Sequence, residues 1–350
     1  LALVPIFFYL VLGFYRVLGR RSFPIVILVM MALGWRTYIR NADYRSVELI
    51  WRETLFYAPF NYRAHNNYAE FLFKEKKWNE AEEHLQEAIR LEPCNVNPYN
   101  NYGTLYLAQG RLQDAEKMFR KALEINSSFA SAWNNLGSAL KEEGRKNDAI
   151  NAYQKSLEVE ASYFKAALNL GNIYVEQGNL EKAEFMYRRC IVIAPKNFVG
   201  YTSLAQLLES KEAWNEVLQL DEVAVQLNPF FAPLRYRYAL SLEKKGNLPK
   251  ALEQMKEAVK QDPHSLERKL YLAQLYFHHG DYDEAISTYQ NILREKPRNA
   301  TPYLNLGMIF EKRNQWEQAE AIYLEGVQIV PMDSLLVKRL QKIQEKLLSP

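Results

Sequence analysis

Asparagine residues recur along the first half of the chain at a spacing of 34 residues, at Asn67, Asn101, Asn135 and Asn169. Three of them directly follow a second asparagine, which adds Asn66, Asn100 and Asn134. A primary amide carries two N–H donors and a carbonyl acceptor, so it can bind a peptide unit whatever side chain that unit has. The same amide can instead bond to a neighbouring helix and serve the fold alone. The spacing therefore indicates either a polar strip that binds polypeptide or a set of ties between helices.

The period of 34 residues also orders the rest of the chain. Eight rows fit residues 62–333 without an insertion or deletion, and every row has Gly or Ala at its eighth position. The twentieth position is Ala in seven rows, the fifteenth is Gly in five and the thirty-second is Pro in six. Small residues let two helices approach closely, Gly accepts the left-handed conformation at a helix end, and Pro ends the second helix. Each row thus predicts a helix–turn–helix unit that must stack on its neighbours.

These row features, carried for example by Gly103, Ala115 and Pro93, resemble the tetratricopeptide repeat family. The resemblance implies an all-α fold, a right-handed superhelical solenoid of eight repeats whose first helices line a concave groove. Row positions 5, 6, 9 and 12 are then among those that border the groove. The candidate groove residues at these positions are Asn66, Asn67, Asn100, Asn101, Asn134, Asn135, Asn169, Asn172, Tyr236, Arg237, Tyr271, Phe277 and Asn305.

The asparagines at position 6 are similar to the asparagine ladder of O-GlcNAc transferases, which grips extended protein substrates. That similarity implies a protein or peptide as the partner. Neighbouring packed helices sit about 8–10 Å apart and an extended peptide advances about 3.3 Å per residue, so each asparagine would meet roughly every third residue. Several groove positions of rows six and seven hold aromatic or apolar residues instead, which indicates pockets for side chains in that part of the groove. They are Tyr236, Leu240, Leu270, Tyr271 and Phe277.

The first forty residues differ from the rows. They hold two apolar runs, at about 1–19 and 23–39, and the arginines Arg16, Arg20 and Arg21 lie near the end of the first run and between the two. The second run would span roughly 25 Å as a helix against a hydrocarbon core of about 30 Å, so residues 1–40 predict a transmembrane hairpin. The chain begins with Leu rather than Met, and the first run could then be the end of a truncated span. The alternative is a buried apolar helix that caps the solenoid.

Residues 41–61 continue the 34-residue frame backwards. Val47, Trp51 and Pro59 take the small, aromatic and proline positions of a second helix, so a half-repeat should precede the first full repeat. The stretch WRTYIRNADYRSVELIWRETL (35–55) resembles the junction between the last membrane helix and the repeats in transmembrane-and-tetratricopeptide proteins, which are GT-C type glycosyltransferases. This resemblance implies that the repeats lie in an extracytoplasmic space, periplasmic or luminal. Arginines on both sides of the second apolar run leave the orientation undecided by charge.

The sequence shows no constellation that predicts catalysis, a cofactor or a metal site. It has no phosphate loop, nucleophile triad or paired-carboxylate cleft, and the catalytic acids of GT-C enzymes lie in membrane loops without a counterpart here. His278 and His279 are adjacent on a helix end and should point apart. Residues 1–61 carry seven arginines against three acids, which leaves 37 basic and 38 acidic residues for the remainder. A near-neutral solenoid argues against nucleic acid as a partner.

Two further expectations concern packing. Asp221 stands where other rows carry an aromatic residue, so we expect it to be exposed or to pair with a base such as Arg235, because an unpaired buried carboxylate is costly. Residues 334–350 predict an amphipathic capping helix. Its apolar stripe is Leu336, Leu340, Ile343 and Leu347.

Two functions of different class follow from these patterns. The first is a membrane-anchored scaffold that binds an extended polypeptide or partner protein in its concave groove. The second is the substrate-recognition region at the C-terminal end of a polytopic GT-C glycosyltransferase. In the second case the chain would be part of an enzyme, although no catalytic residue can be assigned within it.

Overall fold

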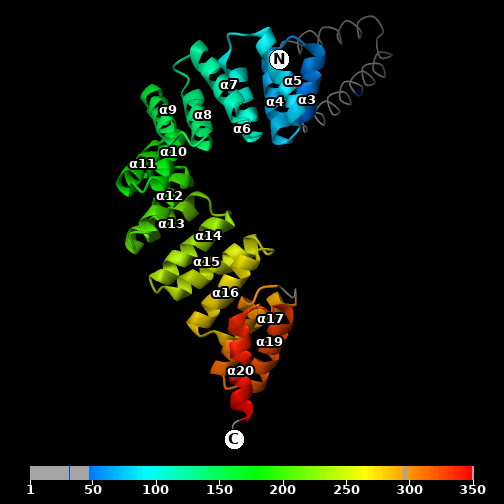
Figure 1. The fold of residues 1–350 in the computed structure, drawn as a ribbon, viewed down its shortest axis with the longest axis vertical. Helices are drawn as coiled ribbons and strands as arrows, with labels where there is room; N and C mark the ends of the chain where they lie inside the picture. Colours follow the sequence, from blue (N-terminus) through cyan, green and yellow to red (C-terminus); the bar gives the residue numbers. More distant parts are fainter. Residues whose placement is uncertain (1–30, 32–46, 295–297, 349–350) are drawn as a thin grey trace, which may run out of the picture. The chain divides into compact units, whose positions relative to one another are not determined.

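The computed structural model describes Met31, residues 47–294 and residues 298–348. All regular structure in these residues is helical and follows the predicted rows, in eighteen helices labelled α3 to α20 (Figure 1). The chain divides into two units, residues 1–161 and 162–350. The first unit contains α3 (Val47–Tyr57), α4 (Tyr62–Lys74), α5 (Trp78–Leu91), α6 (Val96–Ala108), α7 (Leu112–Ile125), α8 (Ala130–Glu142) and α9 (Lys146–Val159).

The second unit has the same alternation of helices. It contains α10 (Phe164–Glu176), α11 (Leu180–Ile193), α12 (Phe198–Glu209), α13 (Trp214–Leu227), α14 (Ala232–Lys244), α15 (Leu248–Gln261), α16 (Leu266–His279), α17 (Tyr282–Leu293), α18 (Thr301–Lys312), α19 (Trp316–Ile329) and α20 (Ser334–Leu348). Within each unit every helix packs on the one that follows it, so each row forms a helical hairpin stacked on its neighbour.

The predicted transmembrane segments, at about 1–19 and 23–39, lie outside the described residues apart from Met31. The start of the predicted half-repeat, 41–46, lies outside them as well. Of the helices that the structure does describe, none combines the length and the apolar character that crossing a bilayer requires.

Glycine at position 8 of the first helix meets an aromatic ring at position 24 in the second helix of the same row. A Cβ added to Gly171 would lie 2.3 Å from Cε1 of Tyr187, so a larger residue there would force the ring or the helix to shift. The four pairs of this kind are Gly103–Phe119, Gly137–Tyr153, Gly171–Tyr187 and Gly307–Tyr323. Three of the four rows with Ala at position 8 instead carry Leu85, Asp221 and Met255 at position 24, whereas row seven combines Ala273 with Tyr289. The sizes of the two residues therefore complement each other in seven of the eight rows, as close packing favours.

The turn after the first helix of each row contains a residue with positive φ at position 15. Five rows use glycine there, with φ between 74° and 95°. The other three rows adopt the same backbone without glycine, with φ of 60° at Lys76, 55° at Glu212 and 58° at Asn314. Left-handed backbone is unfavourable for residues with a Cβ, so these three helix ends carry local strain.

Helix α3 makes the same ion pair to the following row as the second helices of the repeats do. Glu48 Oε1 on α3 lies 3.7 Å from Lys77 Nζ of the first row. The same two row positions pair again in the next rows, as Glu82 with Arg111 at 3.7 Å and Glu116 with Arg145 at 2.8 Å. Helix α3 therefore packs on α4 in the same way as α5 packs on α6 (Figure 1).

Helix α20 covers the end of the last row. Leu336, Leu340 and Ile343 are buried against the core that surrounds Tyr303 and Tyr323, whereas Leu347 is exposed. The Asp333 carboxylate caps the helix by accepting hydrogen bonds from the backbone N–H groups of the residues two and three positions ahead. Three of the four residues in the predicted apolar stripe are therefore in the core.

Candidate functional site

The asparagines of the first unit bond to one another across rows. Asn101 on α6 donates from Nδ2 to Oδ1 of Asn66 on α4 at 2.9 Å. Asn135 on α8 makes the same bond to Asn100 on α6 at 3.0 Å. The residue at position 6 thus ties its helix to the position-5 asparagine of the preceding row. These bonds establish the helix–helix ties as one role of the amides.

Bonds within a row extend these contacts to two groups of three amides, which together are called the amide network. The groups are Asn66, Asn67 and Asn101, and Asn100, Asn134 and Asn135. Asn66 donates to Asn67 Oδ1 at 3.2 Å, and Asn134 donates to Asn135 Oδ1 at 3.2 Å. The position-5 amides are buried and the position-6 amides are half-buried. A buried amide needs such partners, because an unsatisfied polar group in the interior is costly. The position-6 amides remain the outer, solvent-facing edge of the network.

Two further predicted amides are held by tyrosines of the second unit. Asn172 on α10 accepts a hydrogen bond from the Tyr187 hydroxyl at 2.7 Å. Asn305 on α18 donates to the Tyr289 hydroxyl at 2.9 Å. Burial raises the pKa of both tyrosines to about 12, so both hydroxyls are neutral at physiological pH. Asn169 lies half-buried on α10 of the same unit.

Asp221 is buried and paired with an arginine, which is one of the two expected alternatives, but the arginine is not the one named. Its carboxylate on α13 is 1% exposed, and its partner is Arg237 rather than Arg235. Arg237 Nε donates to Asp221 Oδ1 at 2.7 Å, and its Nη2 lies 2.7 Å from Glu209 Oε1 on α12. Arg235 instead donates to Gln254 and to the carbonyl of Pro229. Residues two apart on a helix point in different directions, which is why only one of the two arginines reaches Asp221.

Carboxylates at position 12 were missed by the sequence interpretation. Each contacts position 6 of the following row, 28 residues further on. Glu209 pairs with Arg237, Glu243 accepts from the Tyr271 hydroxyl, and Glu311 lies 3.3 Å from Arg339 of the capping helix. The signal available in the sequence is the recurrence of Glu at position 12 in rows five, six and eight.

Aromatic side chains cluster beside these carboxylates in rows six and seven. Tyr236 and Tyr271 meet edge to face, with ring centroids 5.3 Å apart. Phe277 lies 5.8 Å from the Tyr282 ring, and Lys312 Nζ lies 4.6 Å from the centroid of the Phe277 ring. The predicted aromatic pair of rows six and seven is therefore in contact, while Phe277 belongs to a neighbouring cluster partly covered by a lysine.

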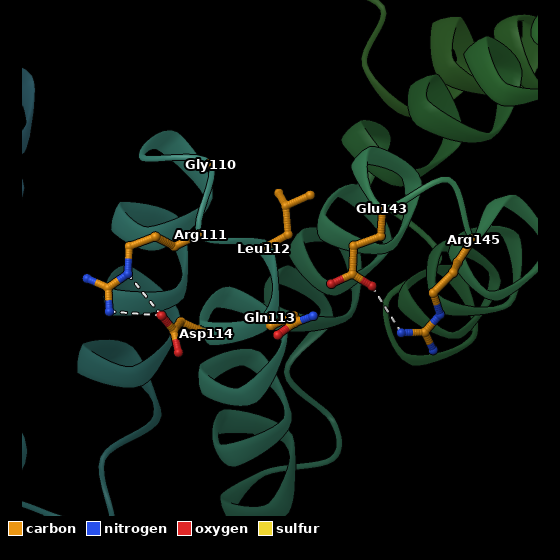
Figure 2. A pocket seen from close by; sticks show the side chains of 7 residues that line it. All are labelled: Gly110, Arg111, Leu112, Gln113, Asp114, Glu143 and Arg145. Carbon is orange, nitrogen blue, oxygen red and sulfur yellow. Dashed lines mark hydrogen bonds and ion pairs between the residues drawn. The ribbon is translucent and has the colours of Figure 1, made fainter.

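A separate cleft of about 590 Å³ lies at the turns of rows two and three. Figure 2 shows its lining, with Arg111 directed at Asp114 and Arg145 directed at Glu143. The shortest contacts are 2.8 Å and 3.1 Å respectively. Its charged residues thus pair with each other, and its lining includes none of the predicted groove residues.

In the described part of the chain no three His, Cys, Asp or Glu residues lie close enough together to hold a metal ion. His278 and His279 bond to different carboxylates, Glu243 at 2.7 Å and Asp281 at 3.0 Å. The two histidines therefore do not converge on one point.

Comparison with known proteins matches the chain to tetratricopeptide repeat models over residues 62–128, 96–162, 164–197, 236–300 and 276–342. The Photosystem I assembly protein Ycf3 of Synechococcus sp. (strain WH7803) is 35% identical over 88 residues, which cover 24% of this chain and 51% of that protein. Its counterpart from Prochlorococcus marinus (strain NATL2A) is 33% identical over 90 residues, 25% of this chain and 52% of that protein. The chain thus spans about half the length of these curated relatives.

Two solved structures share the fold. Yeast Tom70 aligns over 84% of this chain and 61% of its own, with a TM-score of 0.53 and 20% identity. Pseudomonas aeruginosa PilF aligns over 61% of this chain and 97% of its own, with a TM-score of 0.51 and 17% identity. At these identities the likeness concerns the fold alone.

Proposed function

We propose that this chain, which belongs to the tetratricopeptide repeat family, is a scaffold whose first helices bind an extended polypeptide. The observation that carries the proposal is the amide network of α4, α6 and α8. Its position-5 amides are buried and fix the helices, so its half-buried position-6 amides are held at a fixed spacing with a face toward solvent. Uncharged amides at that spacing suit the backbone of a polypeptide, whatever its sequence.

The chemistry of the network limits what position 6 can offer. Asn101 donates one of its two Nδ2 hydrogens to Asn66, and Asn135 donates one to Asn100. Each of these two amides therefore has a second N–H that can donate to a ligand. Three rows with a helix spacing of about 8–10 Å would hold about six extended residues at about 3.3 Å each. Each net hydrogen bond contributes about 0.5–1.5 kcal/mol, so a few of them give a weak, sequence-tolerant site.

The test compares two variants that lose a buried hydrogen bond. Asn101→Ala removes a position-6 amide and leaves Asn66 Oδ1 without its donor, whereas Ser156→Ala removes a buried bond of 2.8 Å from α9 to the carbonyl of Ala130. Each should lower the free energy of unfolding by about 1–3 kcal/mol. Only Asn101→Ala should weaken binding of unstructured peptides from an array, by roughly 2- to 10-fold.

Fluorescence anisotropy well below the melting temperature of both variants measures this affinity on folded protein. Equal affinity losses in Asn101→Ala and Ser156→Ala would show that the amides act through stability alone. An unchanged affinity in Asn101→Ala would place the ligand on another surface.

The partner is proposed to be a protein awaiting assembly into a complex. The support is the identity of 35% with a protein named for assembly, over about a quarter of this chain. Co-purification of a defined protein subunit with the wild type, reduced in Asn101→Ala and retained in Ser156→Ala, would support this role. Recovery of the same subunit with all three proteins would contradict it.

Membrane anchoring through residues 1–40 is also part of the proposal. Its support is the pair of apolar runs in the sequence. Fractionation of cells that express the full chain tests it, because an anchored protein stays in the membrane pellet through alkaline carbonate and is released by detergent. Release by carbonate alone would contradict the anchor.

The alternative proposal is the substrate-recognition region of a GT-C glycosyltransferase. It rests on the junction sequence at 35–55, whereas the matched repeat models begin at residue 62. Bound polypeptides should then carry O-linked glycans whose occupancy falls in cells that express Asn101→Ala. Unchanged glycan occupancy together with reduced polypeptide binding would favour the scaffold over the enzyme.

A further inference from the structure

Two histidines face each other in the first row. His65 on α4 and His84 on α5 have their Nδ1 atoms 2.8 Å apart, and the ring centroids are 5.0 Å apart. His65 is buried and His84 is half-buried, with the Tyr68 ring 4.8 Å from the His84 ring. Two nitrogens at this distance must share one proton, because a hydrogen bond needs one donor and one acceptor.

The tautomers follow from a third contact. His65 Nε2 lies 2.9 Å from the carbonyl oxygen of Pro59, which can only accept, so Nε2 carries the proton. Nδ1 of neutral His65 is therefore the acceptor, and Nδ1 of His84 is the donor. This arrangement links the turn after α3, helix α4 and helix α5 through two imidazole rings.

Protonation disfavours the arrangement. One added proton places a charge in a half-buried site, although one Nδ1 can still donate to the other. A second added proton makes both Nδ1 atoms donors, so the hydrogen bond between them is lost. We propose that the His65–His84 pair is an acid-sensitive contact that holds α4 on α5 in the first repeat above about pH 6.5 and loosens this packing below that pH.

The surrounding charges do not cancel this effect. Burial, followed by His65, lowers the pKa of His84 against the opposing influence of three glutamates on its own helix. One of these glutamates, Glu87, is held by Arg90. Helix α6, which packs on α5, has no charged residue in its sequence. The charged groups on the neighbouring α3 and α4 are Glu48, Arg52, Glu53, Arg63, Glu70 and Lys74.

The direction of the pH effect follows from the lowered pKa of His84. Between the folded pKa and the unfolded value of about 6.5, the unfolded chain binds more protons than the folded chain. Stability is therefore present above about pH 6.5 and falls as the pH drops toward the folded pKa of His84. The loss is local, because the contacts join only α3, α4 and α5. It also reaches Asn66, the first member of the amide network, which directly follows His65.

Hydrogen exchange of the full chain, with a chelator present, tests the proposal. After correction for the intrinsic exchange rate, the opening equilibrium constant of residues 47–91 should rise by up to about tenfold for each pH unit below about 6.5. The opening equilibrium constant of residues 112–159, in the same unit, should not change with pH. His84→Gln keeps an amide N–H for His65 but removes the titrating ring, so it should reduce the pH dependence. His264→Gln, at an exposed histidine of the second unit, is the matched control and should keep it.

The outcomes are distinct. A parallel pH course for 47–91 and 112–159 in the wild type would overturn the proposal, as would an unchanged pH dependence in His84→Gln. If His84→Gln does not fold, the imidazole titration of the wild type by NMR decides. A His84 midpoint below about 6.5 supports the proposal, and a midpoint at or above it refutes the proposal.

Discussion

Arg237 on α14 and Asp221 on α13 form an ion pair of 2.7 Å in which the carboxylate is almost completely buried. Two rows later, the same two row positions hold Asn305 and Tyr289, which form a neutral hydrogen bond of 2.9 Å. One junction between rows is therefore charged where the corresponding one is neutral. Removing one member of a buried ion pair leaves an uncompensated charge, which costs far more than losing a neutral partner.

Arg237→Ala should therefore destabilise the second unit strongly, by about 3–5 kcal/mol, because Asp221 would lose its partner. Arg235→Ala is the matched control. Arg235 bonds to an amide and a backbone carbonyl, so its loss should cost only about 1–3 kcal/mol. Urea unfolding followed by circular dichroism measures both.

The double variant Asp221→Leu/Arg237→Asn tests the explanation for that loss. It copies the junction between rows one and two, where Leu85 and Asn101 occupy these positions. It should recover most of the stability lost in Arg237→Ala, because no buried charge remains. A double variant as unstable as the single one would show that Arg237 contributes by packing.

The pH dependence of this junction has a defined sign. Burial raises the pKa of Asp221 in the folded chain, outweighing the lowering by Arg237. The folded state then binds more protons than the unfolded one between the unfolded pKa of about 3.9 and the folded pKa. The wild type should gain stability relative to Asp221→Asn as pH falls from about 7 toward about 4. A constant difference between the two proteins over that range would show that Arg237 holds the carboxyl at its ordinary pKa.

The sequence predicted the helices well because the rows repeat small residues at fixed positions. Gly110 and its equivalents mark the helix ends, and Gly103 marks the close approach of two helices. The complementary sizes of positions 8 and 24 were also visible in the sequence, since Gly171 and Tyr187 lie in one row. These features depend only on distances within a row, which the repeat fixes.

Contacts between rows were harder to predict. An amide such as Asn101 can bond either to a ligand or to the preceding first helix. Which of these bonds forms depends on the distance between the two helices, and this distance cannot be derived from the residue pattern. The partner of Asp221 depends in the same way on which face of α14 meets α13. The frame of 34 residues places Arg235 and Arg237 on the same helix, and only the packing selects one of them.

Gly171→Ala should disrupt the fourth row. The added Cβ would lie 2.3 Å from the Tyr187 ring, which is buried and cannot move away freely. Overpacking of this kind costs about 1–3 kcal/mol. The double variant Gly171→Ala/Tyr187→Leu follows the first row, which has Ala69 and Leu85, and should restore part of the loss. Thermal melting of both variants measures this, and a double variant that melts below Gly171→Ala would disprove the size argument.

Glu212→Gly should stabilise the fifth row. Glu212 has a φ of 55°, a backbone conformation that costs a residue with a Cβ roughly 1–2 kcal/mol and costs glycine much less. After allowing for the larger entropy of glycine in the unfolded chain, we expect a net gain of about 0.5–1 kcal/mol. Gly178→Ala is the reverse change at a φ of 74° and should destabilise its row by about 1 kcal/mol. The urea midpoint should therefore rise in Glu212→Gly and fall in Gly178→Ala. Shifts of the same sign in both variants would rule out backbone strain as the cause.

The capping helix should stabilise the last row through a few buried leucines. Leu336 is fully buried against the core around Tyr303 and Tyr323, so Leu336→Ala should cost about 2–5 kcal/mol. Leu348→Ala is the matched control on the same helix, because Leu348 is 86% exposed and its truncation should change stability by less than about 0.5 kcal/mol. The loss in Leu336→Ala should be largest in α18 and α19, since α20 packs on these two helices. Hydrogen exchange resolved by segment measures it, and an equal response of residues 164–193 and 301–329 would mean that the second unit unfolds as a whole instead of fraying from its capped end.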